Sequence, residues 1–187
     1  MTKIIAISGS LRAGSLNTAV LRAAASRAPE GVEVEVLDPA LLKALEPYDE
    51  DDDGLNAPPH ATAVREKIQS ADVVLISTPE YNGTVPGQLK HVIDWGSRPR
   101  GESAALYAKP VAVISTSPSD YGALWAGEAV RKSLGIAGAR VVAEIDLAIG
   151  GAFGKFDESG QLTDAELGGR LDEILDQLSS LHKAQAA

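Results

Sequence analysis

The sequence predicts an α/β fold in which helices cover both faces of an open, doubly wound, five-stranded parallel sheet. Continuous apolar runs such as Lys3–Ile7, Asp72–Ile76 and Pro110–Ile114 are typical of strands that are buried on both faces. Segments with helical spacing of apolar residues alternate with these strands along the chain. Because the carboxyl ends of parallel strands share one edge of the sheet, we expect the ligand site in the loops at that edge.

Length and composition limit the function classes. The 187 residues, 44% of them hydrophobic, are enough for one domain, 1–187, with its own core. The net charge of −9 argues against nucleic-acid or anionic-membrane binding as the main activity, so a small-molecule partner is expected. The chain has no cysteine, which excludes disulfides and thiolate catalysis. Any electron transfer must therefore use a bound cofactor.

The amino terminus indicates a cytoplasmic protein without a membrane span. Its apolar segment, Ile4–Ile7, is too short for the core of a signal peptide or for a transmembrane helix.

The first strand runs into the loop Ser8–Asn17, and a helical pattern resumes at Leu16. Free N–H groups and the helix dipole make such a junction a site for an anion. Arg12 adds a guanidinium that can bind phosphate oxygens, and the hydroxyls of this loop add short donors. The loop matches neither the Walker A pattern nor G-x-G-x-x-G, which favours a mononucleotide phosphate. The alternative is an ordinary connection in which Ser15 only caps the helix.

The next segments predict a half-exposed strand, an acidic loop and a helix. Val32–Leu37 alternates apolar and polar residues, as a strand with one wet face does. The acidic run Glu46–Gly54 is interpreted as a solvated loop; its match to a calcium-binding loop is incomplete because His60 stands at the twelfth position. Pro58–Pro59 suits the start of a helix that ends near Ser70.

A second informative loop follows the central strand Asp72–Thr78. Pro79 and Pro86 stiffen it, and Asn82-Gly83 is a strong turn signal that exposes backbone N–H and C=O groups. A flat polar heterocycle could pair with that rigid backbone. The alternative is a plain strand–turn–helix junction with Tyr81 on the surface.

Together these two loops resemble the flavodoxin-like NAD(P)H-dependent FMN reductases, a family that includes quinone, chromate and azo-dye reductases. The motifs are Gly9-Ser10-Leu11-Arg12-Ala13-Gly14-Ser15-Leu16-Asn17 and Pro79-Glu80-Tyr81-Asn82-Gly83-Thr84-Val85-Pro86-Gly87-Gln88-Leu89-Lys90-His91-Val92-Ile93-Asp94-Trp95. The resemblance extends over nearly the whole chain and implies a flavodoxin-like sheet with strand order 2-1-3-4-5. It also implies FMN as cofactor, with its phosphate on the first loop and its isoalloxazine ring on the second.

The resemblance places the following residues at the cofactor: Ser10, Arg12, Ser15, Leu16 and Asn17 on the first loop, and Pro79, Glu80, Tyr81, Asn82 and Gly83 on the second. For Glu80 we expect a role of the backbone rather than of the carboxylate. Thr116 and Ser117, after the fourth strand, complete the set as contacts of the ribityl chain or ring edge. The loop there departs from the family, whose members usually carry more glycine at this point.

The rest of the chain predicts the last helices and strand. Aromatic Tyr121 and Trp125 lie near a helix start, where they either cover the nicotinamide side of the flavin or serve packing. The fifth strand is expected over Val141–Leu147. The glycines of residues 149–157 indicate turns, and Thr163 with Glu166 predicts a capping box for the closing helix.

The expected function is hydride transfer from NADPH or NADH to bound FMN, then reduction of a quinone-like or other electron-poor acceptor by a ping-pong mechanism, with no catalytic side chain and no metal. The alternative is a flavodoxin-like FMN-binding electron carrier without enzyme activity. A hydrolase is disfavoured because the chain has no G-x-S-x-G motif and its three histidines are scattered. A homodimer or homotetramer is expected from the resemblance, with Trp95, Tyr107 and Trp125 as candidate interface aromatics.

Overall fold

The computed structural model describes the backbone of residues 1–54 and 57–186, and the side chains of residues 1–54 and 57–181. In this part of the chain five strands form one parallel sheet in the order β2-β1-β3-β4-β5. The strands are β1 (Thr2–Ser8), β2 (Val32–Val36), β3 (Val73–Thr78), β4 (Pro110–Thr116) and β5 (Arg140–Ile149). The helices are α1 (Leu16–Ser26), α2 (Pro39–Ala44), α3 (Pro59–Ser70), α4 (Gly87–Gly96), α5 (Leu124–Ile136), the short 3₁₀ helix η2 (Ala152–Lys155) and α6 (Ala165–Ala186). The predicted flavodoxin-like sheet and its order are confirmed.

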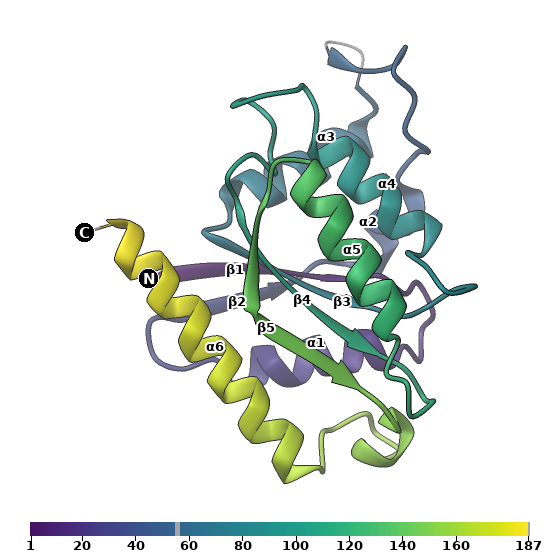
Figure 1. The fold of residues 1–187 in the computed structure, drawn as a ribbon, viewed down its shortest axis with the longest axis vertical. Helices are drawn as coiled ribbons and strands as arrows, with labels where there is room; N and C mark the ends of the chain where they lie inside the picture. Colours follow the sequence, from purple (N-terminus) through teal and green to yellow (C-terminus); the bar gives the residue numbers. More distant parts are fainter. Residues whose placement is uncertain (55–56, 187) are drawn as a thin grey trace.

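Two layers of helices bury the sheet from both sides. Figure 1 shows α1 and α6 on one side of the sheet, and α3, α4 and α5 on the other. Successive side chains of a strand point to opposite faces, so Ile4 faces α1 and α6 while Ile5 faces the opposite helices. Both are fully buried, which is why the central strands read as uninterrupted apolar runs.

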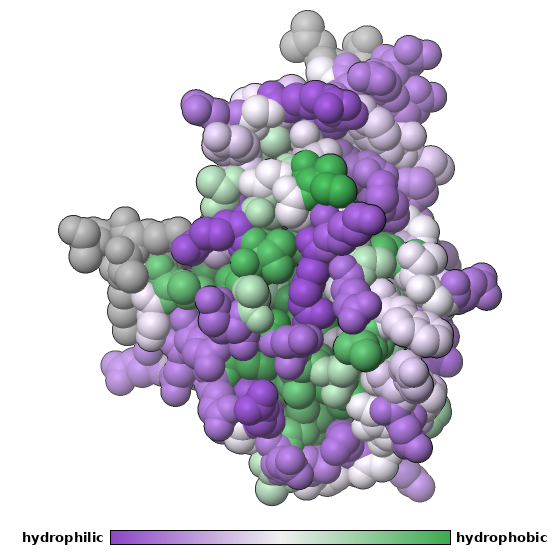
Figure 2. Space-filling view, viewed as in Figure 1, coloured by the Kyte–Doolittle hydropathy of each residue, from purple (hydrophilic) through white to green (hydrophobic). Residues whose placement is uncertain are grey.

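The two edges of the sheet differ from its centre. β2 is half-buried, with Glu33 exposed, as its alternating sequence predicts. β5 is longer than predicted, and its pairing with β4 is irregular between Val111 and Val113. Hydrophobic surface is visible in Figure 2 where Figure 1 shows β5 passing between α5 and α6.

Some local features differ from the sequence-based expectations. The short helices α2 and η2 were not predicted. The predicted capping box at Thr163 is wrong, because the carboxylate of Asp164 accepts the N–H of Leu167 at 2.7 Å. The Thr163 hydroxyl instead donates to the carbonyl of Lys155 at 3.3 Å. The cap therefore lies one residue later, on the stronger acceptor.

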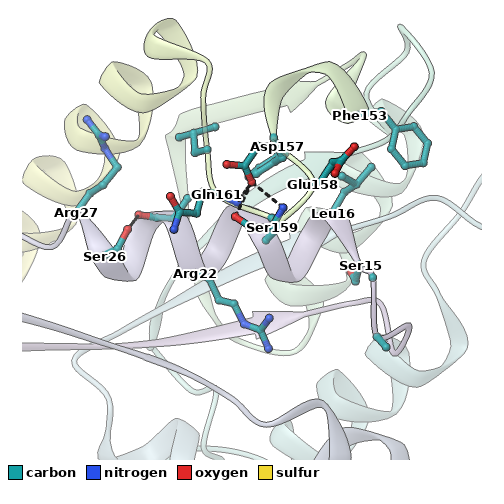
Figure 3. A pocket seen from close by; sticks show the side chains of 17 residues that line it. Ser15, Leu16, Arg22, Ser26, Arg27, Phe153, Asp157, Glu158, Ser159 and Gln161 are labelled. Carbon is teal, nitrogen blue, oxygen red and sulfur yellow. Dashed lines mark hydrogen bonds between the residues drawn. The ribbon is translucent and has the colours of Figure 1, made fainter.

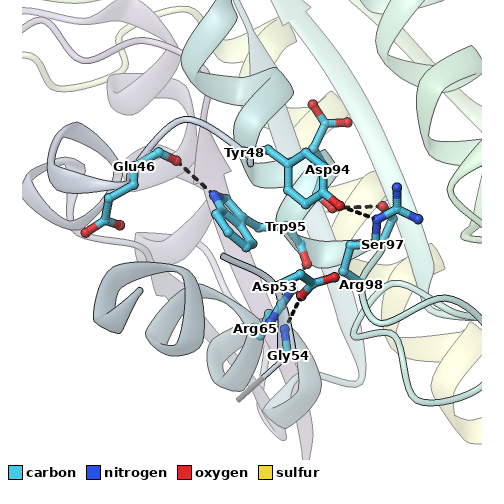
Figure 4. A network of polar contacts seen from close by, with 9 residues as sticks. All are labelled: Glu46, Tyr48, Asp53, Gly54, Arg65, Asp94, Trp95, Ser97 and Arg98. Atoms are coloured by element: carbon cyan, nitrogen blue, oxygen red, sulfur yellow. Dashed lines mark hydrogen bonds and ion pairs between the residues drawn. The ribbon is translucent and has the colours of Figure 1, made fainter. Parts of the chain in front are cut away.

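The acidic segment is bound to α3 and α4 at its two ends (Figure 4). Trp95 donates its indole N–H to the Glu46 carbonyl at 2.8 Å and is fully buried, so the expectation that it serves an interface is wrong. Arg65 pairs with Asp53 at 2.6 Å, and both side chains are less than one fifth exposed. Asp53 is therefore held in an ion pair and is not part of a solvated loop.

The described histidines have local partners. His60 Nδ1 lies 2.9 Å from a carboxylate oxygen of Glu46, and this hydrogen bond holds the pKa of the Glu46 carboxyl below its ordinary value. His91 Nδ1 accepts the backbone N–H of Tyr48 at 3.3 Å. The His182 side chain lies outside the described residues.

Among the described residues, no helix is long and apolar enough to cross a membrane.

Candidate functional site

Three loops at the carboxyl edge of the sheet, together with the start of α1 and the end of β4, contain the predicted site residues. We call residues 9–15, after β1, loop 1; residues 79–86, after β3, loop 2; and residues 117–123, after β4, loop 3. Because β3 lies between β1 and β4, loop 2 stands between the other two. The sheet thus assembles segments more than 100 positions apart into one site.

Loops 1 and 2 meet through a close backbone approach at Gly9. Its N–H donates to the carbonyl of Ser77 at 2.8 Å, which continues the sheet pairing past the end of β1. A methyl group on Gly9 would lie only 3.0 Å from side-chain atoms of both Pro79 and Leu89. The first glycine of the motif is therefore required for packing against loop 2.

A buried polar cluster joins loop 1 to the ends of β3 and β4. The Asn17 amide donates to the Thr116 carbonyl at 3.2 Å and accepts the Ser77 hydroxyl at 2.8 Å. The hydroxyls of Ser77 and Thr116 lie 3.2 Å apart. All three residues are at most 4% exposed. Asn17, predicted at the cofactor phosphate, therefore connects the start of α1, directly after loop 1, to the ends of β3 and β4.

Loop 1 itself presents unpaired backbone donors. In the described part of the chain, the N–H groups of Leu11, Arg12, Ala13 and Gly14 have no hydrogen-bond partner. Ser15 caps α1, because its hydroxyl oxygen accepts the N–H of Thr18 at 3.2 Å. The predicted alternative role of Ser15 as a cap is confirmed, and it is compatible with an anion at the same helix end.

The other loop 1 side chains differ in exposure. Arg12 is exposed, and its guanidinium donates a 3.3 Å hydrogen bond to the carbonyl of Gly14. Ser10 is 3% exposed, and its N–H donates to the Ser8 hydroxyl oxygen at 3.3 Å. Leu16 is half-buried against the α1–α6 side of the core. The Arg12 guanidinium is therefore the exposed cationic donor of loop 1, whereas Ser10 is buried.

Loop 2 contains a tight two-residue turn. Tyr81 and Thr84 exchange two backbone hydrogen bonds, at 3.3 and 3.2 Å, across Asn82 and Gly83. Asn82 has φ +53° and Gly83 has φ +76°, the signs of a type I′ turn. Tyr81 is 47% exposed. The predicted turn is confirmed, and residues 81–84 are exposed at the carboxyl edge of the sheet.

Glu80 ties loop 2 to the start of α5. Its carboxylate accepts the backbone N–H of Ala126 at 3.2 Å. This N–H is one of the unpaired donors of the first helical turn, and a negative charge is favourable there. The carboxylate therefore has a definite partner, which the sequence-based preference for a backbone role did not include.

Loop 3 is held by the end of β5 and by the residues that follow it. Ser117 donates its N–H to the Ile149 carbonyl at 3.0 Å, and its hydroxyl lies 2.8 Å from that of Ser119. Gly150 packs so closely on Asp120 that a Cβ would lie 2.5 Å from the Asp120 carbonyl oxygen. Thr116 is buried beneath this loop, whereas Ser117 is half-exposed at its start.

A groove of about 880 Å³ extends from loop 1 along α1, opposite residues 156–162 (Figure 3). Ser15 and Leu16 line its end near loop 1, and Arg22, Arg27 and Phe153 line the rest. No residue of loop 2 or loop 3 contributes to it. The groove therefore adjoins the proposed phosphate end of the site and leads away from the turn of loop 2.

Two groups in this site were not identified from the sequence. Ser77 is the buried hydroxyl that joins Asn17 to Thr116, and Ala126 supplies the N–H that binds Glu80. For Ser77, the sequence offered one signal: the polar pair Ser77-Thr78 stands at the end of an apolar strand. Among the described residues, no group of three or more His, Asp or Glu side chains is placed to hold a metal ion.

Comparison with known proteins gives consistent matches. The model of the family described as NADPH-dependent FMN reductase matches residues 2–154. A quinone reductase of Pseudomonas putida is 41% identical over 162 residues, which cover 86% of this chain and 84% of that protein. An NAD(P)H-dependent FMN reductase of Pseudomonas aeruginosa is 36% identical over 162 residues, covering 87% and 85%. The flavoenzyme NAD(P)H:(acceptor) oxidoreductase FerB from Paracoccus denitrificans superimposes with a TM-score of 0.86 at 28% identity, covering 98% of each chain.

Proposed function

This chain belongs to the family of NADPH-dependent FMN reductases, which are oxidoreductases, and from that premise we propose a specific reaction. FMN bound at the carboxyl edge would take a hydride from NADPH or NADH and pass the electrons to a quinone-like or other electron-poor acceptor in a ping-pong cycle. The chain would act as one FMN-binding domain in the cytoplasm.

The phosphate of FMN fits loop 1. Four consecutive backbone N–H groups of this loop, from Leu11 to Gly14, have no partner in the described part of the chain. Arg12 adds a positive charge, and the amino end of α1 adds the favourable helix dipole. A dianionic phosphate would accept hydrogen bonds from these N–H groups and from the Arg12 guanidinium.

The isoalloxazine ring fits the outer edge of loop 2. The type I′ turn at Asn82 and Gly83 fixes a row of backbone groups, and Tyr81 presents an exposed ring beside it. A flat heterocycle with alternating donors and acceptors can pair with such a backbone. Thr116 and Ser117, at the end of β4, lie on the other side of β3 from β1, and the Thr116 carbonyl accepts the Asn17 amide. There they would contact the ribityl chain or the ring edge.

The observation that supports this proposal best is the set of links among the three loops. Three hydrogen bonds connect the strand ends in pairs. Gly9 to Ser77 connects β1 with β3, Asn17 to Thr116 connects the helix after β1 with β4, and Glu80 to Ala126 connects loop 2 with the helix after β4. Each link is a hydrogen bond within the protein, so the chain's own groups hold the three loops together. Preorganisation of this kind lowers the entropic cost of binding a cofactor and holds its ring in place for two successive substrates.

Initial-rate kinetics test the proposed cycle. The rate of NADPH oxidation would be measured against NADPH concentration at several fixed concentrations of a quinone. Parallel double-reciprocal lines are expected, because the oxidised nucleotide leaves before the quinone enters. Lines that intersect would refute the ping-pong proposal, and bound FMN without NADPH or NADH oxidation would identify the electron carrier instead.

We also propose that the chain forms a homodimer or homotetramer. Ile136 is 80% exposed and Tyr107 is 46% exposed, and the two line one groove of about 470 Å³ between α4 and α5. Exposed large apolar side chains that share one surface are typical of subunit contacts. Sedimentation velocity would measure the mass in solution; a monomer at micromolar concentration would refute the proposal.

A further inference from the structure

Two large aromatic side chains stand exposed beside the proposed ring site. Tyr121, in loop 3, is 59% exposed, and Trp125, in the first turn of α5, is 52% exposed. Their ring centroids lie 5.0 Å apart with the planes tilted by 54°. We call this pair the aromatic wall. Neither ring is needed to fill the core, because the buried face of α5 consists of Ala126, Val130 and Leu134.

The aromatic wall adjoins the turn of loop 2. A Cβ on Gly83 would lie 3.9 Å from Cε3 of Trp125, which is ordinary contact distance. The next residue, Ala126, donates its N–H to the Glu80 carboxylate at 3.2 Å. Trp125 is therefore held against the same turn that is proposed to bind the flavin ring.

The backbone beneath the aromatic wall is fixed from the other side as well. Gly122 has φ +62°, and a Cβ there would lie 3.0 Å from backbone atoms of Ala148 and Ile149. Ala123 adopts the left-handed conformation, with φ +61°, although it is not glycine, and it is 2% exposed. A strained backbone held by its surroundings is a feature of sites with a defined geometry.

The charges near the aromatic wall favour a neutral ligand. The Glu80 carboxylate accepts the N–H of Ala126, the residue after Trp125, and the exposed Asp120 precedes Tyr121 in the chain. These charges disfavour the phosphates of a nicotinamide dinucleotide at this position, whereas an uncharged planar ring is unaffected. Indole and phenol rings stack well on such a ring.

We propose that Tyr121 and Trp125 form one side of the acceptor site and stack on the planar, uncharged quinonoid ring of the electron acceptor. This inference rests on the proposed function, because it assumes a flavin ring on loop 2. It identifies Trp125 as a residue that determines acceptor affinity, with Tyr121 supporting its ring. Small acceptors that transfer electrons without stacking gain nothing from the aromatic wall.

A nuclear magnetic resonance titration tests the contact directly. The chain has two tryptophans, so protein labelled with ¹⁵N-tryptophan gives two indole N–H signals, and Trp125→Phe assigns them. Tetramethyl-1,4-benzoquinone would be added to the oxidised, FMN-loaded protein without nucleotide. Because the chain has no cysteine, no protein thiol can add to the quinone as a side reaction. A saturable shift of the Trp125 signal is expected, with the signal of the buried Trp95 unchanged.

Steady-state kinetics of Trp125 variants with two acceptors give a second test of the inference. Trp125→Ala should raise the KM for tetramethyl-1,4-benzoquinone by roughly three- to tenfold, as expected for the loss of one aromatic stacking contact. Trp125→Phe should restore most of the affinity, and the KM for ferricyanide should stay at the wild-type value in both variants. Phe153→Ala is the matched control, since it removes a 66% exposed aromatic side chain from η2, at the same edge of the sheet.

Two results would overturn the inference. One is a Trp125 signal that stays in place while FMN is bound and is reduced normally by NADPH. The other is a Trp125→Ala variant whose KM for the quinone is unchanged, or rises equally for ferricyanide. A wild-type chain that takes up no FMN would instead refute the proposed function, and this inference with it.

Discussion

Arg12→Ala separates the contribution of the phosphate end from that of the fold. The side chain is exposed, and it donates a 3.3 Å hydrogen bond to the Gly14 carbonyl within the same loop. Its loss should therefore change the free energy of unfolding by less than about 0.5 kcal/mol. A charge-assisted hydrogen bond to a phosphate contributes about 1.5–3 kcal/mol, which corresponds to roughly a 10- to 150-fold rise in the Kd for FMN.

The assay is the quenching of FMN fluorescence on titration with apoprotein, repeated with riboflavin, which lacks the phosphate. Arg12→Ala should weaken FMN binding and leave riboflavin binding unchanged. Arg12→Lys should recover part of the loss, because it keeps the charge without the planar pair of donors. Arg22→Ala removes the same charge from an exposed position on α1 and is the matched control.

The reasoning would be refuted by an Arg12→Ala variant that binds FMN within twofold of the wild type. Equal weakening of FMN and riboflavin would also contradict it, because the arginine would then act on the ring or on the fold.

Three further predictions concern the scaffold. Asn17→Ala should lower the free energy of unfolding in urea by about 1–3 kcal/mol, because the buried carbonyl of Thr116 loses its donor. Gly83→Ala should cost about 1–2 kcal/mol in the same assay, since φ is +76° there, and a Gly14→Ala control should be nearly neutral. The hydrogen bond from Lys67 holds the pKa of the Glu35 carboxyl below its ordinary value. The stabilising effect of Glu35 is therefore fully present above the unfolded-chain pKa of about 4.3, and it is lost as the pH falls through the folded-state pKa. Glu35→Gln should therefore flatten the acid limb of stability against pH; an unchanged limb would contradict the assignment.

The sheet was predictable because its signals are local. Isoleucine and valine on consecutive positions of β1, β3 and β4 indicate strands with two buried faces, and the structure buries them on both. The Asn82-Gly83 pair predicted the turn of loop 2 for an equally local reason, since both residues tolerate positive φ.

The side-chain contacts of the site were not predictable in the same way. Asn17 lies 60 positions from Ser77 and 99 from Thr116, and no periodic pattern specifies which distant partner a buried amide finds. Its hydrogen bonds to the ends of β3 and β4 became clear only from the structure, and its contact with a phosphate stays a prediction.

Trp95 shows why an aromatic residue is difficult to assign from its position alone. On the sequence it was a candidate for an interface, but the indole is fully buried and donates to the Glu46 carbonyl. Its partner belongs to the acidic segment, whose composition indicates solvent exposure. Trp125, of the same residue type, is 52% exposed beside the turn of loop 2.

The most direct test of the central claim is the visible spectrum of the purified chain loaded with FMN, recorded without oxygen before and after addition of NADPH and, separately, NADH. We expect one bound FMN per chain and the loss of its visible absorption band with at least one of the two nucleotides. A chain that binds FMN but keeps the band with both nucleotides would contradict the reductase assignment. A chain that binds no FMN would contradict the assignment of loops 1 and 2 as the cofactor site.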